Sequence, residues 1–551
     1  MSERAANVSA LLGDRAVDAP GSLALVDAGT DASRTWQQLD ADVDAFARGL
    51  SSLGLVAGHR VVLALGNGIC FVTSYLAVLR AGLVAVPVDP RSAADELAGA
   101  VVDSGARVVV ADTATVDLVR AAVGPRSAGG GDDVPAAAQL VVQGPDPRPG
   151  ELAWDDVAAR GSGPLVSPVV SPADAERLAV LVYPSGTGAP PRGVMLSHRA
   201  LLANIEQIGA LDRPAMTRDD VVLGLIPLFH IYGLNAVLGQ VLATGARLVL
   251  VQEFDAEQTL RLVAEHRMTN LPVTPPAVAA WAGRPDLSGL FASVRLLVCA
   301  ASPVDPGPPA VLAGATGVTV ERSYWLPETA PVVTSTLASP TAAGGTPRPA
   351  AGAGSPLPGV EVQVVDPRGD QVSGGDPGQI RVRGPNLFSG YWPDAGDGPD
   401  ADGWWSTGDL AVVGPDGDLV VIDRLDELVN VSGFTVYPSE VESVIGDLDE
   451  VAEAAVIGTP DELTGEAVLA FVVGASPGLA ADELVDRVRT HCGLSLARFK
   501  QPTEIAVLPR LPRSVTGRVA KDRLRARPGP ARSDPARSDP ARSGPARAGP
   551  G

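Results

Sequence analysis

Residues 183–193 read YPSGTGAPPRG, a stretch rich in glycine, serine and threonine that follows the apolar run LAVLVY. Small residues let successive backbone N–H groups turn toward an anion, and Ser185 and Thr187 add hydroxyl donors. Arg192 supplies a cation that can neutralise phosphate charge. The chain continues through Ser197, the predicted N-cap of an amphipathic helix that reads RALLANIEQIGAL. A strand, a small-residue loop and a helix in this order predict a phosphate-binding turn, although such loops are often plain turns.

Length and composition narrow the class of protein. A chain of 551 residues is too long for one ordinary core and predicts two or more domains. Its formal net charge of −21 argues against a general nucleic-acid binder, because duplex affinity depends on clustered cations. The N-terminus shows no signal-peptide pattern, and the three cysteines lie far apart without metal-type spacing. These features predict a reduced, cytoplasmic setting.

The order of apolar runs predicts the architecture. Short β-branched runs alternate with helical patterns, which favours an α/β fold with mostly parallel sheets; the runs are RVVLAL (60–65), LVAVPV (83–88), ARVVVAD (106–112), LAVLVY (178–183), ARLVLV (246–251) and VRLLVCA (294–300). The most apolar stretch, 61–88, contains Asn67 and Arg80, so it fits strand–helix–strand packing better than a membrane span.

Changes in sequence pattern along the rest of the chain predict smaller structural parts. Residues 125–150 are rich in Gly, Pro and Asp and are interpreted as a surface insertion. From residue 360, short strands with turns predict a β-rich subdomain, and after residue 426 strand and helix patterns predict a compact α+β module. Residues 528–551 repeat PARSD and PARSG and are expected to be disordered. The predicted domains are therefore 1–424, 425–527 and a tail at 528–551.

Lysine is almost absent. Only Lys500 and Lys521 occur among the 43 basic residues, which leaves 41 arginines. This bias explains how arginine could arise at positions where lysine is usual, but a planar guanidinium does not simply replace an ammonium group.

Five further motifs follow the loop in a fixed order: IPLFHIYGL (226–234), YWLPET (324–329), GWWSTGDL (403–410), DRLDELVNVSGFTVYPSEVE (423–442) and PRSVTGRVAKDRLR (512–525). Together with the loop they resemble the superfamily of AMP-forming acyl-CoA synthetases, luciferases and peptide-synthetase adenylation domains. Its usual loop is YTSGTTGxPKGV, and the resemblance spans about residues 10–525. The resemblance implies a large N-terminal adenylate-forming domain, with parallel-rich sheets and a β-rich subdomain, and a small mobile α+β C-terminal domain.

The resemblance also implies a nucleotide site. The expected contacts are phosphate binding, packing on adenine, Mg²⁺ coordination by a carboxylate and acceptance of hydrogen bonds from the ribose hydroxyls. By motif position, Ser185, Gly186, Thr187 and Arg192 are expected to bind phosphate, Tyr324 to pack on adenine and Glu328 to coordinate Mg²⁺. Asp409 is expected to accept the hydrogen bonds from the ribose hydroxyls, and Arg424 to bind the ribose.

The same alignment of motifs implies roles outside the nucleotide. His230 and Trp325 would line the acyl pocket, Asp426 would be the hinge, and Gly433 would belong to the loop that enters the site for thioester formation. Arg518 stands where the family has a catalytic lysine that bridges the acyl carboxylate and the α-phosphate. With Glu328 and Thr187, it completes the expected catalytic set.

The resulting hypothesis is an AMP-forming acyl-CoA ligase, an acid-thiol ligase that uses ATP, Mg²⁺ and CoA to activate a carboxylic acid, with fatty acids as the expected class. Two alternatives stay open. Trp325, Pro327 and Arg518 depart from the family pattern and favour a catalytically impaired protein that binds nucleotide or an acyl ligand. The third reading is an acyl-AMP ligase that loads a separate carrier protein. No nucleic-acid partner is expected.

Overall fold

The computed structural model describes residues 6–123, 138–144, 147–161, 174–184, 192–299, 307–340, 352–372, 375–414, 417–461, 463–476, 478–514 and 518–526. The chain divides into two compact units. The first unit extends to Asp426 and includes Arg513–Arg518; the second is Glu427–Pro512 with the chain from Val519. The predicted tail at 528–551 lies outside the described residues.

The first sheet forms from the predicted apolar runs before residue 200. Its described strands lie in the order β7 (Leu152–Ala153), β6 (Gln139–Gln143), β5 (Val108–Asp112), β3 (Arg60–Ala64), β4 (Val84–Pro87), β8 (Leu178–Val182) and β9 (Val194–Ser197). All neighbours are parallel except β8 and β9. Strand β6 lies inside residues 125–150, so the prediction of a plain surface insertion there was wrong. The run AQLVVQ pairs with β5 and buries Leu140, Val141 and Val142.

A second, larger sheet carries the later runs. Its described strands are β16 (Ser355–Pro356), β15 (Val332–Ser335), β14 (Val320–Trp325), β13 (Leu296–Cys299), β12 (Asn270–Val273), β10 (Val221–Gly224), β11 (Arg247–Leu250), β1 (Leu23–Asp27) and β2 (Ser33–Thr35), in that order. The strands from β14 to β1 are parallel, which confirms the predicted α/β class with mostly parallel sheets. Near-continuous burial on both faces is the reason that such strands can be recognised as apolar runs.

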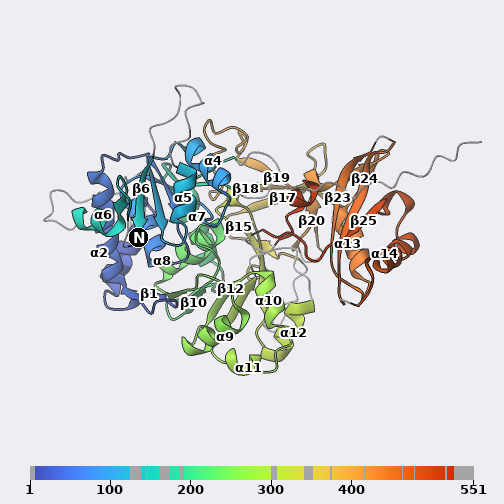
Figure 1. Ribbon diagram of the computed structural model, residues 1–551, viewed down its shortest axis with the longest axis horizontal. Coiled ribbons are helices and arrows are strands. Elements are labelled where there is room, and N and C mark those ends of the chain that lie inside the picture. The colour runs from blue at the N-terminus through green and yellow to red at the C-terminus, as the bar shows by residue number, and fades with distance from the viewer. Residues whose placement is uncertain are drawn as a thin grey trace, which may run out of the picture. The chain divides into compact units, whose positions relative to one another are not determined.

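Helices cover these sheets. The described helices of the first unit are α1 (Ala10–Asp18), α2 (Trp36–Ser52), α3 (Ile69–Arg80), α4 (Ala94–Ser104), α5 (Val116–Val123), α6 (Trp154–Gly161), α7 (His198–Gly209), the π-helix η1 (Tyr232–Gly239), α8 (Gln240–Thr244), α9 (Ala256–Glu265), α10 (Pro275–Trp281), α11 (Leu287–Leu290) and α12 (Gly307–Thr316). Figure 1 shows α9, α10, α11 and α12 gathered beside β10 and β12. Ser197 caps α7 as predicted, because its hydroxyl accepts a hydrogen bond from Ala200 N.

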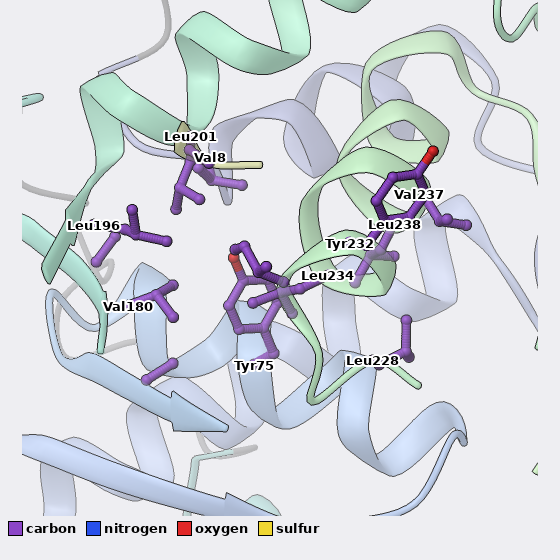
Figure 2. Packing of buried hydrophobic residues seen from close by; sticks show 14 of the residues in the cluster. Val8, Tyr75, Val180, Leu196, Leu201, Leu228, Tyr232, Leu234, Val237 and Leu238 are labelled. Carbon is purple, nitrogen blue, oxygen red and sulfur yellow. The ribbon is translucent and has the colours of Figure 1, made fainter. Parts of the chain in front are cut away.

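The apolar core of the first unit joins elements from distant parts of the chain. Figure 2 shows Tyr75 of α3, Val180 of β8, Leu196 of β9, Leu201 of α7 and Leu234 of η1 packed together. Each of these side chains is at most 1% exposed. Helix α7, which follows the phosphate-loop motif, and η1, which follows His230, are therefore fixed against the same core.

The β-rich subdomain and the second unit also match the sequence expectation. In the first unit, β17 (Glu361–Val365), β18 (Gly378–Arg383), β19 (Trp404–Val413) and β20 (Leu419–Arg424) form an antiparallel sheet. In the second unit, β22 (Phe434–Val436), β21 (Val429–Val431), β24 (Gly465–Gly474) and β23 (Val451–Asp461) form a sheet with β25 (Glu504–Val507) beside β24. Helices α13 (Pro438–Gly446), α14 (Ala481–Ser495) and α15 (Lys521–Arg525) complete this unit.

The two lysines both form ion pairs in the second unit. Lys500 Nζ lies 2.6 Å from Glu440 Oε1. Lys521 Nζ lies 2.9 Å from Glu427 Oε2 and 2.8 Å from Glu442 Oε1, and its side chain is 12% exposed. The two carboxylates raise the pKa of Lys521 against the opposing effect of burial, so the amine stays charged.

A buried amide connects the two large sheets. Asn67 follows β3, is 4% exposed, and directs its Nδ2 toward the carbonyl oxygens of Gly224, Leu225, Ile226 and Val251 at 3.0–3.4 Å. Its Oδ1 accepts a hydrogen bond from Leu228 N at 2.8 Å. One side chain of the first sheet therefore holds the ends of β10 and β11 and the segment that leads to His230.

Replacing this amide should destabilise the first unit. We expect Asn67→Ala to lower the free energy of unfolding by about 2–3 kcal/mol, since Leu228 N loses its acceptor and the nearby carbonyl oxygens lose a donor. Calorimetry and circular dichroism would measure the loss. The exposed Asn430 gives the matched control, and Asn430→Ala should leave the melting temperature unchanged. Equal melting temperatures for both variants would contradict the role assigned to Asn67.

Candidate active site

The phosphate-loop motif is described only at its end. Ser185, Gly186 and Thr187 lie outside the described residues, whereas Arg192 directly precedes Gly193 and strand β9. Arg192 Nη1 lies 2.7 Å from Asp397 Oδ2, and the guanidinium stands 4.3 Å above the ring centroid of Tyr391. The Arg192 side chain is 49% exposed. A charged, accessible guanidinium therefore marks the exit of this loop.

Strand β14 presents the YWLPET motif on both of its faces. Because side chains alternate along a strand, Ser323 and Trp325 share one face and Tyr324 takes the other. Trp325 meets His230 and Tyr232 edge-on, with ring centroids 4.8 Å and 5.8 Å apart. The structure thus brings together His230 and Trp325, the two predicted acyl-pocket residues.

On the other face of β14, Tyr324 meets Asp409. The Tyr324 hydroxyl donates a hydrogen bond to Asp409 Oδ2 at 2.6 Å, and both side chains are buried. Arg424 Nε lies 3.8 Å from Asp409 Oδ1, since β19 and β20 pair with Asp409 directly opposite Arg424. Sheet register therefore brings Asp409 and Arg424 together, and a side-chain hydrogen bond from a strand of another sheet adds Tyr324.

Burial and charge act against each other at Asp409. Burial raises the pKa of this carboxyl, while the Arg424 guanidinium and the Tyr324 hydroxyl act to lower it. The charge of Arg518 also acts to lower it. Arg518 is exposed, and its carbonyl accepts a hydrogen bond from Ser514 N at 2.8 Å. Arg424 in turn lies 3.0 Å from Asp426, after which the chain enters the second unit.

Glu328 lies in a single 3-10 turn, Pro327–Thr329, that follows β14. Its Oε1 accepts a hydrogen bond from the Tyr391 hydroxyl at 2.8 Å. Burial raises the pKa of Glu328, and the Tyr391 hydrogen bond acts in the opposite direction. In the described part of the chain no three His, Cys, Asp or Glu side chains gather as a metal cage. A single carboxylate fits Mg²⁺, which is usually held by one or two carboxylates with substrate phosphates and water.

His230 stands at the start of an unusual helix. Its Nδ1 accepts a hydrogen bond from Tyr232 N at 3.2 Å, and burial lowers the pKa of the imidazole to about 4. The ring is therefore neutral at pH 7. The π-helix η1 follows, and at Gly233 an added Cβ would lie 2.3 Å from the carbonyl oxygen of Pro227. Only glycine allows the helix to start so close to the preceding turn.

A pocket opens beside these rings. It encloses about 500 Å³ of empty space, part of it open to solvent, between α7, η1 and strands β12–β15. Tyr232 and Ser323 line one wall and share a hydrogen bond at 3.2 Å, and most other lining side chains are apolar, among them Met216, Ala236 and Val332. Trp325, on the same strand face as Ser323, stands next to this wall. The mostly apolar lining favours an apolar group.

The predicted thioester loop lies in the second unit. Gly433 forms the turn between β21 and β22 with φ +86°, in the left-handed region that favours glycine. The next residue, Phe434, is 57% exposed and stacks on Phe499 with ring centroids 4.9 Å apart. The turn is therefore an accessible edge of this unit.

Two residues of the site were missed by sequence reasoning. Tyr391 donates a hydrogen bond to Glu328 and stacks under the Arg192 guanidinium. Tyr232 lines the pocket. Tyr232 stands two residues after His230 and could have been found as a second pocket residue. Tyr391 lies 63 residues after Glu328 and has no local signal.

Comparisons with known proteins identify the family of this chain. The family model of the AMP-binding enzymes matches residues 12–392, and that of the AMP-binding enzyme C-terminal domain matches residues 440–518. The chain therefore belongs to the AMP-binding, adenylate-forming enzyme family, and the resemblance inferred from the motifs is confirmed.

Individual CoA ligases and a solved structure are also similar to this chain. The chain is 33% identical to 4-coumarate–CoA ligase-like 9 of Oryza sativa subsp. japonica, over 91% of this chain and 89% of that protein. It is 32% identical to a long-chain-fatty-acid–CoA ligase of Yersinia pestis, with 89% of each chain covered. Among solved structures, ATP-bound MatB from Rhodopseudomonas palustris matches with a TM-score of 0.81 and 30% identity, over 94% of this chain and 98% of that one. These relatives are similar to this chain along nearly its whole length.

No helix among the described segments is long and apolar enough to cross a bilayer. The three cysteines Cys70, Cys299 and Cys492 are all free thiols, and burial raises the pKa of each.

The hydrogen bond between Tyr324 and Asp409 should be measurable as a coupling energy. We expect a double-mutant cycle with Tyr324→Phe and Asp409→Asn to give about 1.5–3 kcal/mol in chemical unfolding, the range for hydrogen bonds to charged groups. The cycle of Tyr324→Phe with Glu361→Gln is the control. Glu361 is exposed on the same antiparallel sheet and pairs with Arg383, so its effect should simply add. Additivity in both cycles would show that the phenol and the carboxylate act independently.

Proposed function

We propose that this protein activates an apolar carboxylic acid with ATP and transfers the acyl group to CoA. The acid's carboxylate oxygen attacks the α-phosphorus, which gives acyl-AMP and releases pyrophosphate. The CoA thiol then attacks the acyl carbonyl, the thioester forms, and AMP leaves. The observation that carries the proposal is the cluster of Tyr324, Asp409 and Arg424 on one face of β14, with an apolar pocket on the other.

The predicted residues that the structure describes lie in surroundings that support the roles proposed for them. Asp409 and Arg424 are assigned to the ribose hydroxyls, and Tyr324 is assigned to the adenine. Arg192 would bind phosphate with Ser185, Gly186 and Thr187 of the loop. Glu328 would hold Mg²⁺, which when bound neutralises phosphate charge.

The pocket side is assigned to the acyl group. The Trp325 ring contacts both the neutral His230 and Tyr232, and Tyr232 lines the pocket. Among the described lining residues none is charged, so none opposes an apolar chain. We place fatty acids first among the substrates because the lining is mostly aliphatic. Aromatic acids come second, since ligases for 4-coumarate are among the relatives.

The two units provide the two half-reactions in this proposal. The first unit acts as the AMP-binding domain and the second as the lid, with Asp426 as the hinge and a tail at 528–551 beyond it. Arg518 would serve adenylation, and the turn at Gly433 would serve thioester formation after the lid rotates. A cytoplasmic location belongs to this proposal and is supported by the three free thiols.

A second candidate function is binding without turnover. It is favoured by the contact of Trp325 with His230 and Tyr232, which places a large ring where the family has glycine. Arg518 in place of lysine points the same way. Acyl transfer to a phosphopantetheinylated carrier protein instead of CoA is the third, and the same assay distinguishes it by product mass.

The decisive assay measures pyrophosphate release with a panel of fatty and aromatic acids. We expect Arg518→Ala to lower acid-dependent release by at least about tenfold, since losing one charge-stabilising donor costs about 100- to 1000-fold in rate. Thioester formation from preformed acyl-AMP should change far less, and Arg518→Lys should match or exceed the parent. If the parent and the lysine variant both bind ATP but release no pyrophosphate with any acid, binding without turnover replaces the ligase proposal.

Trp325 should determine which acids enter the pocket. We expect Trp325→Gly to accept longer or bulkier acids than the parent, because removal of the indole opens the wall beside Tyr232. Trp325→Phe keeps an aromatic ring of smaller size and should fall between the two. The ratio of kcat/KM for long and short acids is the readout. An unchanged ratio in the glycine variant would show that this ring does not limit the acyl site.

A further inference from the structure

Residues 388–397, named here the bridging segment, lie between two parts of the candidate site. Ser389 N donates to Met195 O at 2.9 Å and Met195 N donates to Gly390 O at 3.1 Å, so the segment adds to the outer side of β9. At its start, Phe388 N donates to the carbonyl oxygen of Glu328 at 2.9 Å. The segment therefore contacts both the strand that leaves the phosphate loop and the turn that carries the proposed metal carboxylate.

The Tyr391 side chain contacts both Glu328 and Arg192. Its hydroxyl donates a hydrogen bond to Glu328 Oε1 at 2.8 Å, and one face of its ring carries the Arg192 guanidinium at 4.3 Å. The ring is held edge-on by Phe388, with centroids 5.0 Å apart. Its backbone is also fixed, because Tyr391 N donates to Gly396 O at 3.1 Å. A fixed phenol of this kind can orient both charged groups.

The stacking explains how arginine is accommodated at position 192. A planar guanidinium gains dispersion and cation–π attraction over an aromatic face, and its nitrogens remain available at the rim. Here Nη1 is already engaged by Asp397 at 2.7 Å, while the side chain is 49% exposed. The contact between ring and guanidinium thus fixes the plane of a cation that phosphate can still reach.

We propose that Tyr391 is a positioning residue that orients the Glu328 carboxylate for Mg²⁺ through its hydroxyl and the Arg192 guanidinium for phosphate through its ring. The inference rests on the proposed function, because it assigns these two groups to a nucleotide. It goes beyond that function in coupling them through one side chain. Metal binding and phosphate binding should then be separable by changing the hydroxyl and the ring in turn.

Calorimetric titration of the full chain with ATP, in MgCl₂ and in EDTA, tests the proposal without relying on turnover. Tyr391→Phe loses only the hydroxyl, so ATP affinity in MgCl₂ should fall about five- to tenfold while affinity in EDTA stays within about twofold. Tyr391→Leu also loses the ring and should weaken binding in both conditions. Arg192→Lys should weaken binding in the parent and have little further effect in Tyr391→Leu.

Tyr75→Phe is the matched control for loss of a phenol hydroxyl. Tyr75 is buried in the core, and among the described residues its hydroxyl has no hydrogen-bond partner (Figure 2). This variant should bind ATP like the parent in both buffers. Melting temperatures confirm that each variant is folded, and if Tyr391→Leu unfolds, Arg192→Lys in the parent tests the ring contact alone.

The outcomes separate this inference from the proposed function. If the parent binds ATP and Tyr391→Phe loses no affinity in MgCl₂, or loses it equally in EDTA, the positioning role is wrong while the ligase proposal stands. If the parent binds ATP in neither buffer, the nucleotide function itself fails, and the coupling proposed for Tyr391 fails with it.

Discussion

The structure depends on how two parallel sheets are joined, and the buried amide of Asn67 makes that junction. Its contacts with the ends of β10 and β11 and with Leu228 N bring the carboxyl ends of strands from both sheets together. In open α/β sheets this edge is where ligands bind. The junction also fixes the start of the segment that carries His230. A polar group in a dry interior is costly unless satisfied, so this position tolerates few other residues.

Around this junction the site uses the same arrangement twice. A tyrosine hydroxyl donates to a carboxylate in both pairs, Tyr324 to Asp409 and Tyr391 to Glu328. Burial raises the pKa of each carboxyl, and the phenol offsets part of that cost. Fixed donors keep the carboxylates oriented before any ligand arrives, which lowers the cost of ordering them on binding. Both carboxylates are therefore held by a phenol hydroxyl, and Asp409 also has the Arg424 guanidinium as a partner.

Much of the fold could be predicted, because strands buried on both faces are continuous apolar runs and because Ser197 is a typical N-cap. The candidate site residues could also be assigned by their positions in the sequence motifs. Contacts across the sheets could not be predicted. Asp409 meets Arg424 through strand register and Tyr324 through a contact with a strand of another sheet, and Tyr391 reaches Glu328 across 63 residues. Strand β6 was missed because glycine- and proline-rich sequence surrounds a short apolar run.

The scarcity of lysine has a chemical consequence for a site of this kind. An acyl-adenylate is an electrophile that neutral amines attack, and a lysine beside it can be acylated. Both lysines of the chain lie in the second unit and form ion pairs with glutamates. The basic side chains at positions 192 and 518 are guanidinium groups, which stay protonated and are poor nucleophiles. The basic groups at these two positions are therefore ones that an acyl-adenylate formed beside them would not readily modify.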